Sequence, residues 1–265
     1  MTEQHIPPAR PRGRGKPWAI GGILVAITAV TMSREWGVAF SFESMARNWH
    51  NGAGKIGQLL VPDWSFFPRT IDPLMETLQM AVIATAIGAL VSLPLSFAAA
   101  RLTSPNPIVR TTIRTILNAV RAVPDLLYAA ILVAMVGVGA LPGIIALILF
   151  NVGIIVKLVS ESIETNDPGP LEAARAAGGT TAQIIRSSAL PDTWPAFLSH
   201  TLYVLELNVR ASTVLGLVGA GGLGLLIDAV RTYYRYDQLS LIILEILIIV
   251  VLLEWLSSSV RRRLV

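Results

Sequence analysis

The sequence predicts an all-α polytopic membrane protein with six transmembrane helices. Of the 265 residues, 53% are hydrophobic and 14% are charged, whereas roughly a quarter of the residues in soluble domains are charged. The mean hydropathy is +0.63. Six apolar runs approach the roughly 20 helical residues that cross the hydrocarbon core. These runs lie at residues 18–33, 74–100, 125–140, 141–158, 196–218 and 239–257.

The first apolar run, residues 18–33, follows a basic tail at 1–17 and is expected to be a membrane anchor. A cleaved signal peptide is the alternative, because small residues near Ala29 and Thr31 provide a weak cleavage site. Residues 34–71 mix aromatic and polar side chains, which favours a position at the outer membrane interface. The five remaining spans form a core at 72–258, and a second basic tail occupies 259–265.

The stretch 125–158 contains the sequence Leu141-Pro142-Gly143, which is typical of a tight turn between two short spans or of a kink inside one long span. The charge distribution favours the turn. With six spans and the N-terminus inside, fourteen of the 21 basic residues face the cytoplasm and six face outward. Because basic residues accumulate on the cytoplasmic side, both termini and the loop at 160–195 are expected there.

The loop at 160–195 is predicted to contain two short helices. The sequence Asn166-Asp167-Pro168 favours a helix start, and Glu172 places a carboxylate near the positive end of the helix dipole. Gly178-Gly179 is expected to end this helix. Thr180 and Gln183 have capping-box spacing for a second helix, which Pro191 is expected to stop. Spacing alone leaves open whether this is an ordinary helical hairpin or a docking surface for another protein.

The fifth span carries polar residues, namely Glu206, Asn208 and Arg210. A charge at the bilayer centre costs about 2.5 to 3.5 kcal/mol, so such residues face a partner or a water-filled cavity. Glu206 and Arg210 are four residues apart and can form a structural ion pair. Alternatively, the planar guanidinium of Arg210 lines the path of an anion. Glu245 lies mid-span in the last helix and can face Arg210.

A glycine-rich run follows the fifth span, and Gly219, Gly221 and Gly222 are its central members. It superficially resembles a dinucleotide-binding loop, but no strand precedes it. Small residues permit close helix approach and local unwinding within the membrane. The run is therefore interpreted as a subunit interface or a gate.

The loop from Glu172 to Pro191 resembles the ATPase-docking loop of ABC-importer permeases. Ser188 stands where that family usually has Ile. The positions that match are Glu172, Ala173, Ala174, Gly178, Leu190 and Pro191. The resemblance implies that a separate ATPase binds here. The chain has no G-x-x-x-x-G-K-[ST] phosphate-binding loop of its own, so ATP and Mg are expected to be bound by the partner ATPase, with no cofactor in this chain.

Four further segments are similar to phosphonate-importer permeases, which have a type I, methionine-importer-like fold. These segments are Arg121-Ala122-Val123-Pro124, residues 157–161, residues 164–170 and the run from Asn208 to Gly224. The resemblance implies a homodimeric inner-membrane permease that works with two ATPase subunits and an extracytoplasmic substrate-binding protein. The expected cargo is a phosphonate or a related phosphorus oxyanion, such as phosphite or phosphate.

Other functions are less well supported by the residues. The chain has no cysteine and three histidines, which excludes thiolate metal sites and cysteine nucleophiles. An intramembrane enzyme that uses Glu206, Arg210 or Glu245 lacks an accompanying catalytic set. An ATP-independent carrier and an importer of another small solute remain alternatives. The net charge of +4 is explained by the cytoplasmic loops, so lipid rather than nucleic acid is the expected contact.

Overall fold

A computed structural model describes residues 16–33 and 41–263, which contain no strand. The chain divides into two units, Met1–Ile56 and Gly57–Val265. The predicted basic tail at 1–17 lies outside the described residues except for its last two positions, which begin a helix. Residues 34–40 of the predicted interfacial segment and residues 264–265 of the second tail also lie outside them.

The first unit contains α1 (Lys16–Met32) and most of α2 (Phe42–Leu59). The side chains of α1 from Trp18 onward are largely exposed and apolar. Its 17 residues give a length of about 25 Å, somewhat less than the roughly 30 Å of hydrocarbon core. Exposed Phe42 and Trp49 on α2 are the residue types expected at a membrane interface. Its interfacial position stays a prediction.

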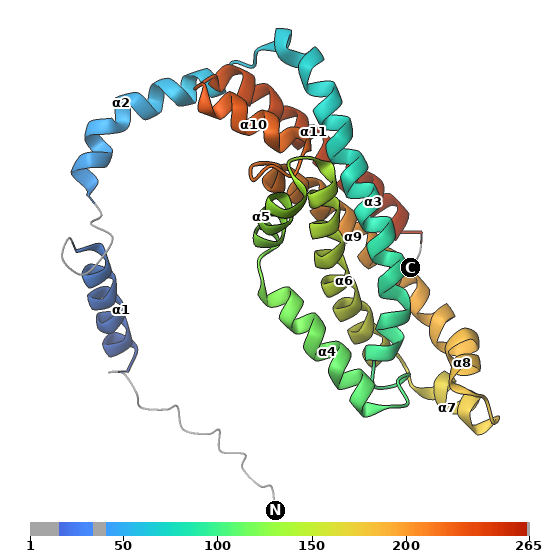
Figure 1. The fold of residues 1–265 in the computed structure, drawn as a ribbon. Helices are drawn as coiled ribbons and strands as arrows, with labels where there is room; N and C mark the ends of the chain where they lie inside the picture. Colours follow the sequence, from blue (N-terminus) through green and yellow to red (C-terminus); the bar gives the residue numbers. More distant parts are fainter. Residues whose placement is uncertain (1–15, 34–40, 264–265) are drawn as a thin grey trace, which may run out of the picture. The chain divides into compact units, whose positions relative to one another are not determined.

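The second unit is a helical bundle (Figure 1). A one-turn 3-10 helix, Trp64–Phe66, precedes it and is capped by Asp63. The Ser65 hydroxyl hydrogen bond lowers the pKa of Asp63. The helices are α3 (Phe67–Ala99), α4 (Pro107–Ala122), α5 (Asp125–Val136), α6 (Ala140–Thr165), α7 (Gly169–Ala176), α8 (Thr181–Ile184), α9 (Leu190–Gly216), α10 (Gly222–Thr232) and α11 (Tyr236–Arg261).

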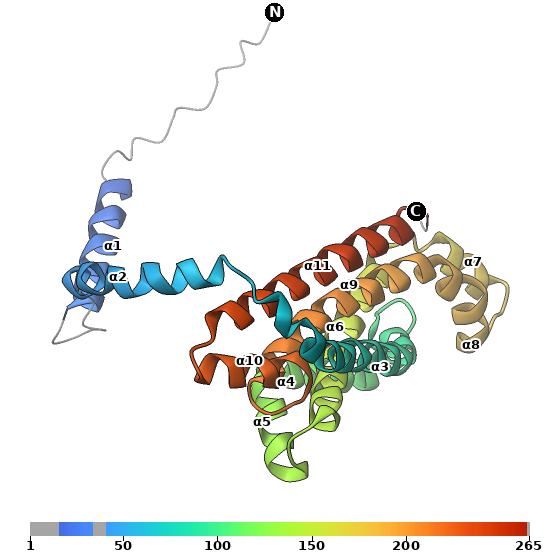
Figure 2. The same ribbon diagram turned by 90° about the horizontal axis from the view of Figure 1, so that it is seen from above.

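The centre of the bundle is the packing of α3 against α6. Met80 of α3 and Leu147 of α6 are fully buried. Gly88 permits close approach, because a Cβ there would lie 2.6 Å from the Cβ of Asn151. The helices α4 and α5 pack against α6, and α9 packs against both central helices. Seen from above, α11 runs beside α9 (Figure 2).

Within the part of the chain that the structure describes, three helices are long and apolar enough to cross a membrane. They are Trp64–Ala99, α6 and α11, and α4 with α5 counts as a fourth span if the bent pair is taken together. The predicted spans at 18–33 and 196–218 are helical, in α1 and α9, but do not meet this criterion. The count of six therefore stays a prediction.

The break between the third and fourth predicted spans exists, but the expected turn at Leu141-Pro142-Gly143 is wrong. The chain turns at residues 137–139, where Gly137 and Gly139 have φ of +100° and +147°. Pro142 lies in the first turn of α6. Proline is tolerated there because the first helical N–H groups have no partner within the helix.

The segment at 101–124, expected to be a basic loop, contains the helix α4. The side chain of Asn106 caps it by accepting the Ile108 N–H at 2.8 Å, and Pro107 follows. Helical spacing places Arg110, Arg114 and Arg121 on one face of α4. The helix then bends by 81° into α5, where Val123 and Pro124 adopt extended or polyproline-like backbone.

The glycine turn, residues 216–224, joins α9 to α10 and packs against α3 and α6. A Cβ on Gly216 would lie 2.5 Å from the Gly221 carbonyl oxygen, and a Cβ on Gly224 would lie 2.2 Å from the Thr213 carbonyl oxygen. The N–H of Leu223 donates to the Thr77 hydroxyl of α3 at 2.8 Å. Backbone contact, rather than side-chain packing, holds this part of the bundle together.

We predict that Gly224→Ala destabilises the protein by about 1 to 3 kcal/mol, because the added methyl group overlaps fixed backbone. The thermal unfolding midpoint of the detergent-solubilised protein measures this effect. Gly52→Ala in α2 is the control, since no neighbouring heavy atom lies within 4 Å of its Cβ position. A Gly224→Ala midpoint equal to that of Gly52→Ala would contradict the packing described here.

Candidate functional site

The coupling cassette, residues 166–191, lies at one end of the bundle, beyond α6 (Figure 1). Its first helix, α7, begins where Asn166-Asp167-Pro168 predicts. The Asp167 carboxylate accepts the Gly169 N–H at 2.9 Å. The Asn166 amide donates to the Asp192 carboxylate at 2.5 Å, so the start of the cassette is tied to the start of α9.

The glycine elbow ends α7 as expected. Gly178 has φ of +82°, a conformation that glycine adopts without steric cost. The N–H of Gly178 donates to the Arg175 carbonyl at 2.9 Å, and that of Gly179 to the Ala174 carbonyl at 3.1 Å. A Cβ on Gly179 would lie 2.9 Å from the same Ala174 oxygen. Both glycines are therefore required by the turn.

The second helix starts at its predicted cap but does not stop at Pro191. The side-chain carbonyl of Gln183 accepts the Thr180 N–H at 2.8 Å. From Thr181 the chain stays helical through a π-helix, Ile185–Ala189, into α9. Pro191 occupies the first turn of α9, and the wider π-turn before it shifts the hydrogen-bond register. The prediction that this proline ends the helix is wrong.

The inner side of the cassette packs on the bundle core. Leu171 and Ile184 are buried in one hydrophobic cluster with Phe97 and Ile163. The Arg175 guanidinium donates to the Leu102 carbonyl in the loop after α3. These contacts fix the position of both short helices relative to α3 and α6.

The six predicted docking residues divide between the two sides of the cassette. Glu172, Ala173, Gly178 and Pro191 are exposed, so they can be reached by another protein. Ala174 and Leu190 are half-buried and pack against the core cluster. The exposed positions are therefore suited to contact, and the other two are suited to hold the cassette in place.

Ser188, the position that departs from the family pattern, lies in the π-helix. It is half-buried, and its hydroxyl oxygen has no hydrogen-bond partner among the described residues. A buried hydroxyl without a partner is unfavourable by about 1 to 3 kcal/mol. The substitution thus removes apolar packing inside the cassette and leaves its outer surface unchanged.

Glu206 pairs with a different arginine from the one expected. Its carboxylate accepts from the Arg261 guanidinium of α11 at 2.7 Å, and its side chain is 8% exposed. The prediction of a Glu206–Arg210 pair is wrong, because Glu206 is drawn into the α9–α11 interface. Arg210 is exposed and has no carboxylate partner in the part of the chain that the structure describes.

The other predicted intramembrane residues bond to α3. The Asn208 amide donates to the Thr85 hydroxyl at 2.7 Å. Glu245 accepts from the Thr70 hydroxyl at 2.6 Å, rather than facing Arg210. Sequence reasoning missed these threonines, because nothing in the local pattern distinguishes them from other small polar residues in a span.

The three predicted gate glycines form the turn between α9 and α10. Gly219, Gly221 and Gly222 have φ of +95°, +85° and +66°. The Gly219 carbonyl accepts the Gly139 N–H at 3.0 Å. A Cβ on Gly222 would lie 2.4 Å from the Thr77 hydroxyl oxygen. The structure places them in a tight junction with α3 and α6, and their role as a gate stays a prediction.

An apolar helical bundle with a rigid two-helix cassette at one end defines a membrane component of a transport system. The chain belongs to the family of binding-protein-dependent transport system inner membrane components, whose model matches residues 92–265. Its fold is that of the type I importer permeases. It is similar to the permease of a methionine ABC transporter in an inward-facing conformation, with a TM-score of 0.69 and 24% identity over 77% of this chain and 99% of that one.

Two curated relatives carry more specific names. The phosphite transport system permease of Stutzerimonas stutzeri is 43% identical over 78% of this chain and 75% of its own length. The phosphate-import permease of Mycolicibacterium smegmatis is 38% identical over 80% of this chain. The match spans 43% of that longer protein. The similarity covers the bundle and its cassette.

We predict that Arg261→Ala destabilises the protein, because it leaves the buried Glu206 carboxylate without its cation. A broken buried pair costs about 3 to 5 kcal/mol, and partial exposure of Arg261 reduces this to about 1 to 3 kcal/mol. In a double-mutant cycle of thermal stability, Glu206→Gln should recover most of the loss. Additive effects of the two substitutions would contradict the pair.

Proposed function

We propose that the chain is the permease subunit of an ATP-driven importer that translocates a phosphorus oxyanion, with phosphite, a phosphonate or phosphate as cargo. The similarity to the S. stutzeri phosphite permease, 43% over 78% of the chain, supports this cargo class. The M. smegmatis phosphate-import permease supports the same class. Neither relative decides among the individual anions.

The observation that carries the proposal is the coupling cassette. It presents exposed, mostly small residues on a surface that is fixed to the core by Leu171, Ile184 and Arg175. A rigid surface can transmit movement of a bound protein to α6 and α9. An ATPase supplied in trans is the partner that fits, since the sequence contains no phosphate-binding loop.

The assembly that follows has two copies of this permease, two ATPase subunits that bind ATP and Mg, and an extracytoplasmic substrate-binding protein. ATP hydrolysis is then a property of the partner and not of this chain. Both termini and the cassette face the cytoplasm, which is supported by the distribution of the 21 basic residues. Lipid surrounds the bundle, and nucleic acid has no role.

Arg210 is proposed to line the translocation path. It is exposed on α9 and has no carboxylate partner among the described residues. An unpaired charge within a span is unfavourable against lipid, so a water-filled path is the suitable environment. Glu206, Asn208 and Glu245 bond to neighbouring helices and thereby position α9 and α11 around that path, with the glycine turn as the flexible junction.

The function is tested by uptake of labelled phosphite into proteoliposomes that contain the complex of permease, ATPase and binding protein. ATP-dependent accumulation is expected, with methylphosphonate and phosphate as competing anions. Accumulation of none of the three would contradict the proposed cargo and favour an importer of another small solute.

We predict that Glu172→Lys or Gly178→Trp abolishes substrate-stimulated ATP hydrolysis while the permease still folds, because both changes alter the surface that the ATPase contacts. Glu43→Lys, an exposed charge reversal on α2, is the matched control. Unchanged coupling in the two cassette variants would remove the docking assignment.

We also predict that Arg210→Lys impairs uptake more than assembly. The substitution keeps the positive charge and loses the bidentate geometry of the guanidinium. Uptake rate and the yield of assembled complex are measured together. Uptake equal to that of the unaltered protein would argue against an anion path at this residue.

A further inference from the structure

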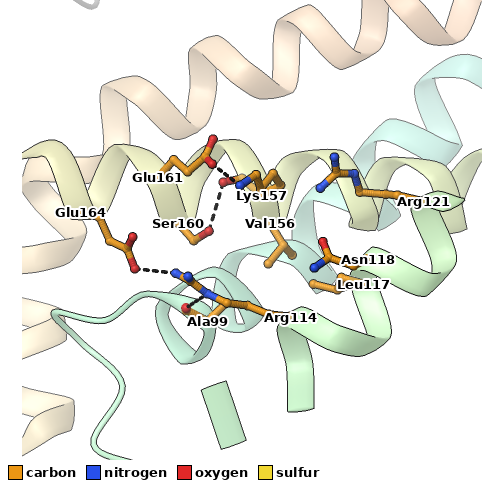
Figure 3. Close-up of a pocket in the computed structure, with 10 residues that line it drawn as sticks. All are labelled: Ala99, Arg114, Leu117, Asn118, Arg121, Val156, Lys157, Ser160, Glu161 and Glu164. Carbon is orange, nitrogen blue, oxygen red and sulfur yellow. Dashed lines mark hydrogen bonds and ion pairs between the residues drawn. The ribbon is translucent and has the colours of Figure 1, made fainter. Parts of the chain in front are cut away.

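A pocket of about 140 Å³ lies between α4 and α6, near the end of α6 that leads into the coupling cassette (Figure 3). Two of the sequence motifs that had no assigned role meet here. Arg121 enters from the last turn of α4, and Lys157, Ser160 and Glu161 enter from α6. We call this site the α4–α6 pocket.

Most of the charge in the α4–α6 pocket is internally compensated. Arg114 pairs with Glu164, and Lys157 pairs with Glu161. Arg114 also donates to the Ala99 carbonyl at 2.7 Å, which makes its pair a structural link between α3, α4 and α6. Figure 3 shows these bonds as dashed lines at one side of the pocket.

Arg121 is the cation of the pocket that is not compensated. It forms no ion pair among the described residues and has no dashed line in Figure 3. The stem of its side chain is seated on Gly153 of α6, where a Cβ would lie 2.7 Å from the Arg121 Cγ. The glycine thus provides the space that places a free guanidinium at the pocket wall.

Arg121 also borders a second cavity, of about 280 Å³, at the bend between α4 and α5. Pro124, Tyr128 and Phe150 line that cavity. The guanidinium therefore lies between two spaces, beside the 81° bend in the broken span. A residue in this position can contact a solute that passes from one space to the other.

We propose that the α4–α6 pocket is a transient binding station for the transported phosphorus oxyanion, with Arg121 as its main cation. This inference rests on the function proposed above. Arginine presents a planar set of N–H donors that suits oxygens of phosphorus. Asn118 and Lys157 supply further donors, whereas the Ser160 hydroxyl already donates to the Lys157 carbonyl at 3.0 Å.

The volume and charge of the pocket fit this role. A water molecule takes roughly 30 Å³ of liquid, so about 140 Å³ accommodates a small tetrahedral oxyanion and excludes a bulky solute. Net attraction from a single uncompensated cation is weak, which a transport site needs because the ion must also leave. The same helix, α6, carries Lys157 and continues to the cassette, so movement of the cassette can alter the pocket.

Uptake of labelled phosphite by the reconstituted complex tests the station. Arg121→Gln should reduce uptake about tenfold or more, the effect of losing a charged hydrogen bond, while binding-protein-stimulated ATP hydrolysis stays within about twofold of normal. Arg121→Lys should recover part of the uptake. Arg110→Gln is the matched control, because it removes the same charge from the same helix outside the pocket. Uptake by Arg121→Gln equal to that of Arg110→Gln would overturn the inference.

A labelling measurement covers the case in which Arg121→Gln fails to assemble. The chain has no cysteine, so Asn118→Cys provides a single thiol at the pocket. Phosphite or methylphosphonate should slow its reaction with a water-soluble thiol reagent in the assembled complex, and should not slow reaction at Arg110→Cys. Absence of protection at position 118 would overturn the station.

The headgroup phosphate of an anionic lipid presents the same chemistry as the cargo. Labelling in vesicles of phosphatidylcholine, with and without phosphatidylglycerol, separates the two sources. Protection that requires phosphite and not phosphatidylglycerol supports the station, and protection by the lipid alone overturns it. If the unaltered complex imports no phosphorus oxyanion, the proposed function fails and the station fails with it. If it does import one and Arg121→Gln imports equally well, the station alone fails.

Discussion

The arrangement of the bundle depends on backbone contact at the glycine turn, residues 216–224. Gly216 and Gly224 touch each other's backbone, and Gly222 lies against Thr77 of α3. Any side chain at these positions would separate α9 and α10 from α3 and α6. Helices in a membrane gain little from the hydrophobic effect between them, so close packing and interhelical hydrogen bonds take its place. The Leu223 N–H to the Thr77 hydroxyl is one such bond.

This packing gives α6 a central mechanical position. The helix packs against α3 along its length, borders the α4–α6 pocket near its last turns, and leads within a few residues into the coupling cassette. Hydrogen bonds from Asn166 and Arg175 connect the cassette to α9 and to the loop after α3. A force on the cassette is therefore shared among three helices and does not merely bend a flexible loop.

Local patterns in the sequence predicted local structure well. The Asn-Asp-Pro start, the glycine elbow and the Thr180–Gln183 cap lie where expected, because each depends on neighbouring residues. The partner of Glu206 was predicted incorrectly, because Arg261 is 55 positions away and its proximity is set by the packing of α11. The helix α4 was missed because its charges suggested a loop, although the spacing of Arg110, Arg114 and Arg121 signalled one helical face. The family resemblance supplied the cargo class, which local patterns do not specify.

The central claim is that the cassette is where an ATPase contacts this permease. Cross-linking in the assembled complex tests it most directly, since the chain has no cysteine and single thiols can be placed at will. A thiol at Ala173→Cys should cross-link to the ATPase subunit, and one at Tyr233→Cys, exposed at the opposite end of the bundle (Figure 1), should not. Cross-linking from position 233 and none from position 173 would contradict the account.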